Sequence, residues 1–187
     1  MNTIHTTNRR WFTAWLLALF MAFIPSHAGA ATVKISLDTP VMISCSLQSV
    51  TNNTYWGCAS ISNATNLYLD EQCFVTWKNG GTVSGTPIIT IYAAGSSDGG
   101  TTYSDGATGS NASQTPTNPV NYKILAVGNV PVASTQYQIG PFSIATAFGG
   151  SLPGNFQLII QNGTGGTSDS TAGNFAVKCQ GIWSTVN

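Results

Sequence analysis

The sequence predicts an all-β protein: a single-domain β-sandwich or jelly roll of about eight to nine strands, mostly antiparallel. Short apolar runs recur along the chain, and none of them shows sustained helical periodicity. Turn residues separate these runs, as at 79–81, 105–106 and 162–163, where Asn, Asp and Gly supply the positive φ of tight turns. Charged residues make up only 6% of the chain, and Thr, Ser, Asn and Gly supply the polar surface instead, as is common in extracellular β-proteins.

Residues 1–30 are interpreted as a secretory signal peptide that is not part of the fold. Arg9 and Arg10 precede an apolar run at 11–24, and the small residues Ala28 and Ala30 fit cleavage after Ala30. The alternative is a retained membrane anchor, but the run is shorter than the roughly 20 residues of a spanning helix. We therefore expect residues 31–187 to form one exported domain, periplasmic or extracellular, that does not contact the membrane after cleavage.

The expected strands follow one another closely along the mature chain. They are placed at 32–37, 40–47, 54–61, 66–77, 87–94, 121–130, 136–146, 156–161 and 174–184. The stretch 95–119 shows no clear strand, and we expect it to form a decorated hairpin and a loop rather than a linker between domains.

The mature chain has few groups for ionic or catalytic chemistry. Both histidines, His5 and His27, lie in the predicted leader, which leaves four lysines against six acidic residues and a net charge of −2. Without a basic patch, nucleic acid is not an expected partner. Without histidine, Ser-His-Asp and Cys-His catalysis and histidine-ligated zinc are excluded. Phosphate-loop and dinucleotide motifs are also missing, so we expect no cofactor and no metal.

Four cysteines in an exported chain predict two disulfides, although four cysteines allow three connectivities. Side chains alternate between faces along a strand. In the strand at 66–77, this alternation places on one face Leu67, Leu69, Glu71, Cys73, Val75 and Trp77. In the strand at 174–184, it places on one face Phe175, Val177, Cys179 and Trp183.

Because Cys73 and Cys179 both lie on apolar faces, their pairing is favoured, and Cys45 and Cys58 then remain as a local clip. The alternative is that all four are buried free thiols that behave as small hydrophobic groups.

The segment SSDGGTTYS at 96–104 fits the spacing Ser-x-Asp-x-Gly-x-Thr-aromatic, which resembles the Asp-box of sialidases and other sugar-active β-proteins. The pattern is carried by Ser96, Asp98, Gly100, Thr102 and Tyr103. A sialidase needs several boxes and an arginine cluster, whereas the mature chain contains no arginine. We therefore interpret the segment as a structural turn, in which Asp98 accepts turn N–H groups, Gly100 takes a positive φ and Tyr103 packs. The alternative is direct contact with a sugar or with calcium.

Enzymatic glycoside hydrolysis is not expected. It needs two carboxyl groups about 5 to 10 Å apart on either side of the scissile bond. Glu71 is the single glutamate of the mature chain, and its neighbour Asp70 must point to the other face of the strand. A binding platform for carbohydrate remains an alternative. Its candidate aromatic residues, which lie nearest to turns, are Tyr55, Trp56, Tyr92 and Tyr103.

The second half of the chain has a recognisable order of parts at 91–109, 122–156 and 174–182. A hairpin strand is followed by aspartate-glycine turns, a Gly-Pro-Phe-Ser strand, a Gly-Gly-x-Leu-Pro turn and a closing strand that ends in Gln-Gly. In this order the chain resembles a family of small β-rich virion proteins, associated with head or tail, that tailed bacteriophages and prophages encode. The leader and the four cysteines depart from that family, because virion parts assemble in the reducing cytoplasm, which leaves open a host-encoded, exported relative.

This resemblance implies a non-catalytic structural or surface-binding protein. Its partners would be proteins of a virion or surface assembly, including further copies of the chain, and its location would be the virion or the outside of the cell. The alternative is a secreted carbohydrate-binding or adhesin module, which would bind a cell-surface glycan through exposed, coplanar aromatic rings.

Overall fold

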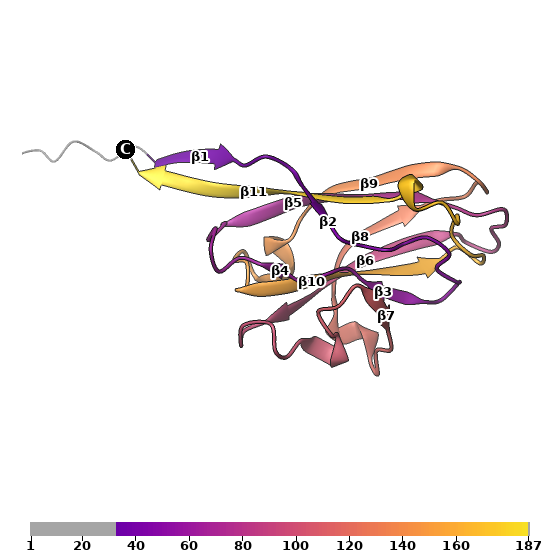
Figure 1. The fold of residues 1–187 in the computed structure, drawn as a ribbon, viewed down its shortest axis with the longest axis horizontal. Helices are drawn as coiled ribbons and strands as arrows, with labels where there is room; N and C mark the ends of the chain where they lie inside the picture. Colours follow the sequence, from indigo (N-terminus) through magenta and orange to yellow (C-terminus); the bar gives the residue numbers. More distant parts are fainter. Residues whose placement is uncertain (1–32, 187) are drawn as a thin grey trace, which may run out of the picture. The chain divides into compact units, whose positions relative to one another are not determined.

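The computed structural model describes residues 33–186. In it the strands pair in a nested order: the last strand pairs with the first, and the pairing continues inward from both ends of the chain (Figure 1). Within this range the strands are β1 (Val33–Leu37), β2 (Val41–Ile43), β3 (Tyr55–Gly57), β4 (Ile61–Ser62), β5 (Asp70–Lys78), β6 (Ile88–Ser96), β7 (Ala112–Gln114), β8 (Lys123–Asn129), β9 (Gln136–Ser143), β10 (Asn155–Gly163) and β11 (Ala176–Val186). Single turns of 3-10 helix lie between them: η1 (Ser104–Gly106), η2 (Pro119–Asn121), η3 (Ala145–Phe148) and η4 (Ala172–Asn174).

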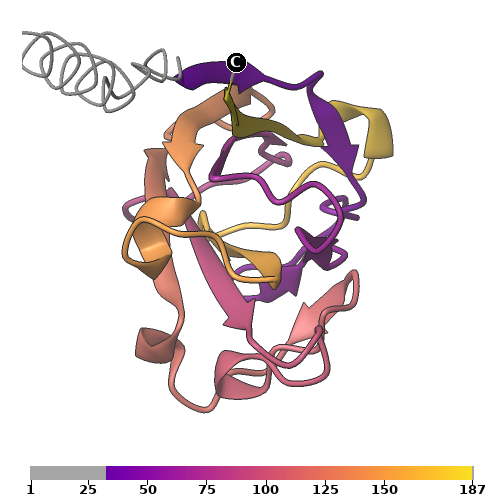
Figure 2. The same cartoon turned by 90° about the vertical axis from the view of Figure 1, so that its left-hand side faces the viewer.

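The nested pairing identifies the fold as a jelly roll. From the outside inward, β2 pairs with β11, β3 and β4 with β10, β5 with β9, and β6 with β8, all antiparallel. This long folded hairpin wraps so that β11 also pairs with β5, and β10 with β6. Two sheets result, one in the order β1-β11-β5-β9 and the other in the order β7-β3-β10-β6-β8 (Figures 1 and 2). The prediction of an all-β sandwich or jelly roll is confirmed, and the pairing selects the jelly roll.

The predicted leader and its cleavage after Ala30 lie outside the described residues, so both stay predictions. Across the described range, 33–186, no helix is long and apolar enough to cross a membrane.

Several expectations about the strands were wrong in detail: eleven strands form instead of eight to nine, and the strand expected at 40–47 ends at Ile43. The stretch 95–119 contains a short strand, β7, and the expected strand at 54–61 is divided into β3 and β4. The strand expected at 66–77 begins only at Asp70, because Leu67 has a φ of 51° and the Asn63 side chain holds the backbone of Tyr68 in a turn. Leu67 and Leu69 are therefore exposed instead of buried.

The main core lies between the two sheets and is built from alternate residues of the long strands. Trp77 is fully buried and packs edge-on against Phe175, with 5.5 Å between ring centroids. On β10, Leu158 and Ile160 face this core, whereas Ile159 packs on the outer side of its sheet, in a second apolar cluster. Burial on both faces explains why this strand is a continuous apolar run instead of an alternating one.

Two disulfides join the cysteines as the sequence predicted. Cys45 bonds to Cys58, and Cys73 bonds to Cys179, which lies directly opposite it in the ladder between β5 and β11. The placement of Trp183 on the core face was wrong, because the pairing of β11 with β5 ends at Ile182 and leaves the Trp183 side chain exposed.

Candidate functional site

The turn after β6 is organised around Asp98. Its Oδ1 atom accepts hydrogen bonds from the Ser96 hydroxyl at 2.7 Å, the Thr102 N–H at 2.9 Å and the Thr101 N–H at 3.1 Å. Gly100 has a φ of 87°, and its N–H donates to the Ser96 hydroxyl. These bonds, with that from Ser96 the largest contribution, lower the pKa of Asp98 to about 2. The hydrogen bonds expected for a structural turn are thus formed within the turn itself.

Tyr103 packs beneath this turn and is only 6% exposed. Its hydroxyl pairs with the hydroxyl of Ser60, and its ring lies against the backbone at Gly109, where an added Cβ would stand 2.9 Å from a ring carbon. The ring is therefore part of the interior. A carbohydrate platform would require a ring that faces solvent, and the Tyr103 ring does not.

The side chains of the other candidate aromatic residues lie on opposite faces of one sheet. Trp56 points to the main core, where its Nε1–H donates to Asn111 Oδ1 at 2.9 Å. Tyr55 and Tyr92 point to the outer face, with 6.0 Å between their ring centroids. Tyr122, which the sequence did not single out, completes this group with its ring centroid 6.0 Å from that of Tyr92.

These three tyrosines line a hollow of about 230 Å³, which we call the tyrosine hollow. Its remaining wall is made of Pro119, Val120 and Ile124. The Tyr92 hydroxyl donates to Gln161 Oε1 at 3.0 Å, and burial raises the pKa of Tyr92 above its usual value. Burial also raises the pKa of Tyr122, so both hydroxyls stay neutral around pH 7.

An apolar strip continues from the tyrosine hollow along β8, the edge strand of its sheet. The ladder between β8 and β6 slips by one residue after Ile124, which makes Leu125 the extra residue of a β-bulge. Because of the bulge, Ile124 and Val127 both face outward and are more than half exposed, while Leu125 and Ala126 pack on the core. Val120 is 77% exposed beside them.

Asp70 and Glu71 lie on opposite sides of β5. Asp70 Oδ1 accepts the N–H groups of Glu71 and Ala145, each at 2.8 Å. Glu71 points to the other side of β5, is 4% exposed and lines a second hollow. Its pKa is raised to about 7, first by burial and then by the nearby charge of Asp70.

Among residues 33–186, one group has metal-ligand chemistry: the Glu71 carboxylate with the sulfurs of Cys73 and Cys179, all within 4.8 Å of one another. Both sulfurs belong to a disulfide, so they are not thiolate ligands for zinc.

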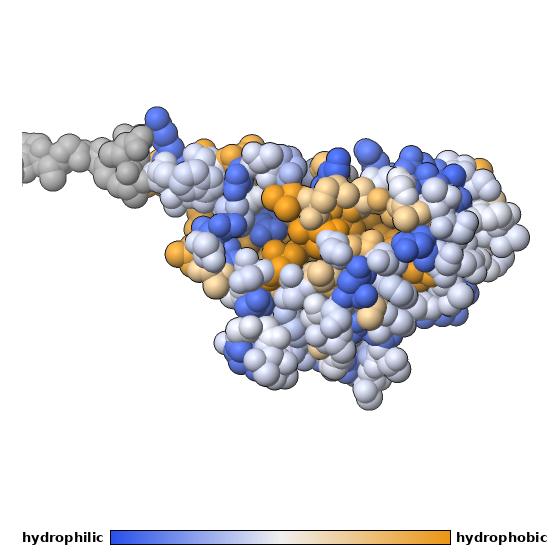
Figure 3. Space-filling model, viewed as in Figure 1, coloured by the Kyte–Doolittle hydropathy of each residue, from blue (hydrophilic) through white to orange (hydrophobic). Residues whose placement is uncertain are grey.

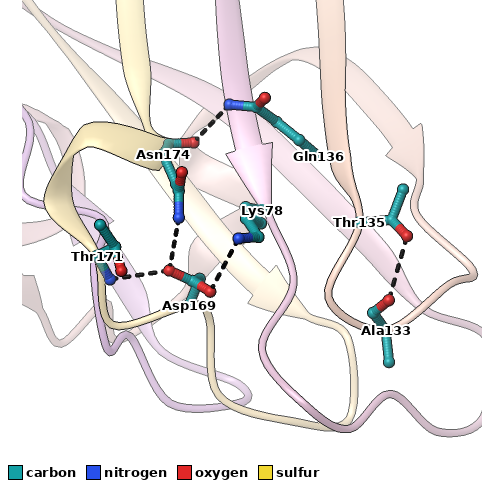
Figure 4. A network of polar contacts seen from close by, with 7 residues as sticks. All are labelled: Lys78, Ala133, Thr135, Gln136, Asp169, Thr171 and Asn174. Atoms are coloured by element: carbon teal, nitrogen blue, oxygen red, sulfur yellow. Dashed lines mark hydrogen bonds and ion pairs between the residues drawn. The ribbon is translucent and has the colours of Figure 1, made fainter.

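Asp169 resembles Asp98 in its surroundings without any motif to mark it (Figure 4). Its Oδ1 accepts the Thr171 N–H and the Asn174 side-chain N–H, each at 2.8 Å, and its Oδ2 lies 3.4 Å from Lys78 Nζ. These contacts, with the Thr171 N–H first, lower its pKa to about 2. They tie the end of β5 to the loop before β11.

The chain was compared with protein families, curated proteins and solved structures, and one solved structure is similar to it. No protein-family model matches the chain, and none of the curated proteins matches it. One chain from the solved structure of Desmodium yellow mottle tymovirus is similar over 87% of this chain and 91% of its own length, with 11% sequence identity and a TM-score of 0.37.

Proposed function

We propose that this protein is a non-catalytic structural or surface-binding protein related to the virion proteins of tailed phages. The single observation that carries the proposal is the exposed apolar strip of Val120, Ile124 and Val127 beside the tyrosine hollow. Contiguous exposed apolar surface marks a site of interaction with a protein, a membrane or a ligand. The jelly roll supports the proposal as well, because viral capsid domains use this fold, although lectins use it too.

The composition of the strip suits a protein partner. Aliphatic residues stand next to tyrosines, whose neutral hydroxyls cost less to bury than charges do. Full burial of one aliphatic side chain contributes roughly 1.5 to 3 kcal/mol. Three such side chains around an aromatic group therefore form a plausible centre for an assembly contact.

Self-association tests the proposal. The chain is expressed with its own leader, recovered from the exported fraction, and its mass is measured by light scattering over a wide concentration range. We expect an oligomer that Ile124→Asp dissociates. The control is Val132→Asp, which changes a similarly exposed residue outside the strip and leaves the oligomer intact. A wild-type protein that is monomeric at every concentration, or an equal effect of both variants, contradicts self-assembly through this face.

The predicted location can be tested in the same preparation. The two disulfides support an oxidising compartment or the outside of the cell. The mass of the exported protein reports cleavage after Ala30, and an intact Met1 refutes the predicted leader.

A carbohydrate-binding or adhesin role is the second candidate, favoured by the three tyrosines that converge on one hollow. Its volume of about 230 Å³ is slightly below the ~300 to 1,000 Å³ of typical small-molecule sites, so it suits a ligand as small as a single sugar. A glycan array tests this role with Tyr55→Ala and, as the matched control, Tyr55→Phe, which keeps the ring. Glycan binding that is lost in the first variant and kept in the second supports this role over the first proposal.

A further inference from the structure

The second hollow opens on the side of the jelly roll where β2 and β4 approach each other. Figure 3 shows apolar surface gathered on this face, in the region that β2 and β4 occupy in Figure 1. The hollow measures about 110 Å³. Its buried lining residues include Glu71 and Cys179, and its apolar wall is formed by Val41, Ile43 and Ile61.

The Glu71 carboxyl group has no partner in this hollow. Its side chain makes no hydrogen bond and no ion pair with any residue between 33 and 186, although it is only 4% exposed. The neighbouring Asp70 shows the usual outcome, because its Oδ1 receives two backbone N–H groups. Among the described residues, every side-chain N or O atom that is sealed from solvent has a hydrogen-bond partner. The Glu71 carboxyl oxygens accept no hydrogen bond there, so they are open to the hollow and can receive a donor from a ligand.

The groups around Glu71 add negative charge and supply no positive charge. The Tyr68 hydroxyl, which also lines the hollow, donates to Asp38, and this bond raises the pKa of Tyr68 to about 12. Tyr68 therefore stays protonated and committed to Asp38. Lys178 is next to Cys179 in β11 and, by strand alternation, points to the opposite face. A ligand that binds the Glu71 carboxylate is thus expected to carry a positive charge.

We infer that this hollow binds a primary ammonium group carried on an aliphatic stem, such as the end of a lysine side chain. The ammonium would donate to Glu71, and the methylene stem would lie along Val41, Ile43 and Ile61. Such an ammonium group can come from a free amine or from a lysine of another protein chain.

Other ligands fit less well. Calcium takes six to eight oxygen ligands and favours several carboxylates, whereas the hollow offers one carboxylate beside the neutral side chains of Thr39, Ser62, Asn66 and Tyr68. The two sulfurs beside Glu71 are bonded to each other and do not bind a soft metal as thiolates do. The volume of about 110 Å³ is well below the ~300 Å³ at which typical small-molecule sites begin, so the hollow suits a narrow group better than a sugar ring.

Titration with n-butylamine at pH 8, followed through the methyl NMR signals of Ile43 and Ile61, tests the inference. We expect saturable binding to the wild-type protein, at least tenfold weaker binding to Glu71→Gln, and unchanged binding to Asp98→Asn, which removes a carboxylate elsewhere. The uncharged analogue 1-butanol should bind at least tenfold more weakly than the amine.

A second variant guards against misfolding of the first. Ile61→Trp fills the hollow from its apolar wall and leaves Glu71 in place, so it should also abolish n-butylamine binding. The inference is overturned if the folded wild-type protein gives no saturable shifts, if Glu71→Gln binds as well as the wild type, or if n-butylguanidine binds more tightly than the amine.

Carbodiimide cross-linking of the concentrated protein distinguishes the two sources of the ammonium group. A lysine of a second copy in the hollow yields an amide bond to Glu71, which mass spectrometry of the peptides identifies and which excess n-butylamine suppresses. Saturable binding of n-butylamine without such a cross-link assigns the site to a free amine or to a lysine of a different protein.

Discussion

Asp98 and Glu71 are carboxyl groups in opposite surroundings. Asp98 is exposed, receives a hydroxyl and two backbone N–H groups, and has a pKa lowered to about 2. Glu71 is buried, receives no hydrogen bond from residues 33–186, and has a pKa raised to about 7. The sequence motif marks the first and nothing marks the second. A carboxylate that already accepts hydrogen bonds from its own turn has little capacity left to bind a ligand. A carboxylate that accepts none keeps that capacity.

Asp169 confirms that no motif is needed for the first kind of carboxylate. It accepts two local N–H groups and has a pKa of about 2, as Asp98 does, but the residues around it do not have the Asp-box spacing (Figure 4). The Asp-box spacing therefore describes one way to build a turn around a carboxylate.

The largest effect should come from the disulfide beside Glu71. Replacing both Cys73 and Cys179 by alanine removes a cross-link between residues 106 positions apart. The entropy of loop closure in the unfolded chain predicts that the free energy of unfolding falls by about 5 kcal/mol. The same change at Cys45 and Cys58, across 13 residues, should cost about 3 kcal/mol. Urea unfolding of both variants measures the difference. A larger loss at the short link would show that strain or packing, and not chain entropy, dominates.

The second largest effect should be a pH dependence of stability that arises from the titration of Glu71. Because its pKa rises from 4.5 in the unfolded chain to about 7 in the folded protein, the folded state holds a proton that the unfolded state releases between these values. Stability should therefore fall as pH rises from 4.5 to 7, by about 3 kcal/mol at most, and stay level above pH 7. Glu71→Gln should remove this fall in urea titrations. An equal slope in that variant would assign the effect to other groups.

Asp98→Ala should lower the melting temperature by a few degrees, since the turn loses its hydrogen-bond acceptor. Asp98→Asn keeps an acceptor oxygen and should lose less. The pKa of Asp98 is lowered from 3.8, so its stabilising effect is present above pH 3.8 and is lost as pH falls through about 2. Melting curves at pH 7 and pH 2 should thus show a gap between wild type and Asp98→Ala that narrows in acid. An unchanged melting temperature combined with lost binding of calcium or a glycan would make the turn a site.

The smallest effect concerns Tyr103. The sequence suggested only a packing role for Tyr103, but its hydroxyl pairs with Ser60, so Tyr103→Phe should cost about 1 kcal/mol. Ser60→Ala should cost a similar amount, and the double variant should cost less than the two single changes together. Additive losses in this cycle would mean that the two hydroxyls do not interact.

The sequence predicted the parts of the fold that follow from local pattern. Alternation along β5 and β11 was enough to pair Cys73 with Cys179, because register and burial both follow a period of two. The sequence did not predict β7, because its residues, Ala-Ser-Gln, do not alternate between apolar and polar. It also missed Tyr122, which lies at the end of a 3-10 turn and meets Tyr92 only through the fold.

The importance of Glu71 could not be predicted for a similar reason. The sequence placed this residue on the core face of its strand, but whether a buried polar group finds a partner depends on distant segments. Asn79, for example, is satisfied by the carbonyls of Val130 and Val132, about fifty positions away. No distant segment supplies a donor to Glu71 among the described residues, and local sequence carries no sign of that.

The nested pairing also sets the order in which the chain can fold. β10 lies between β3 and β6, and β11 lies between β2 and β5, so the central strands of both sheets come last in chain order. While the ribosome still holds these two strands, β5 and β6 have unpaired edges that invite association with other chains. One sheet cannot close before synthesis passes β10, and the other cannot close before it passes β11. Contacts between such distant segments form slowly. The bond between Cys73 and Cys179 is therefore a late event, which follows the docking of the final strand.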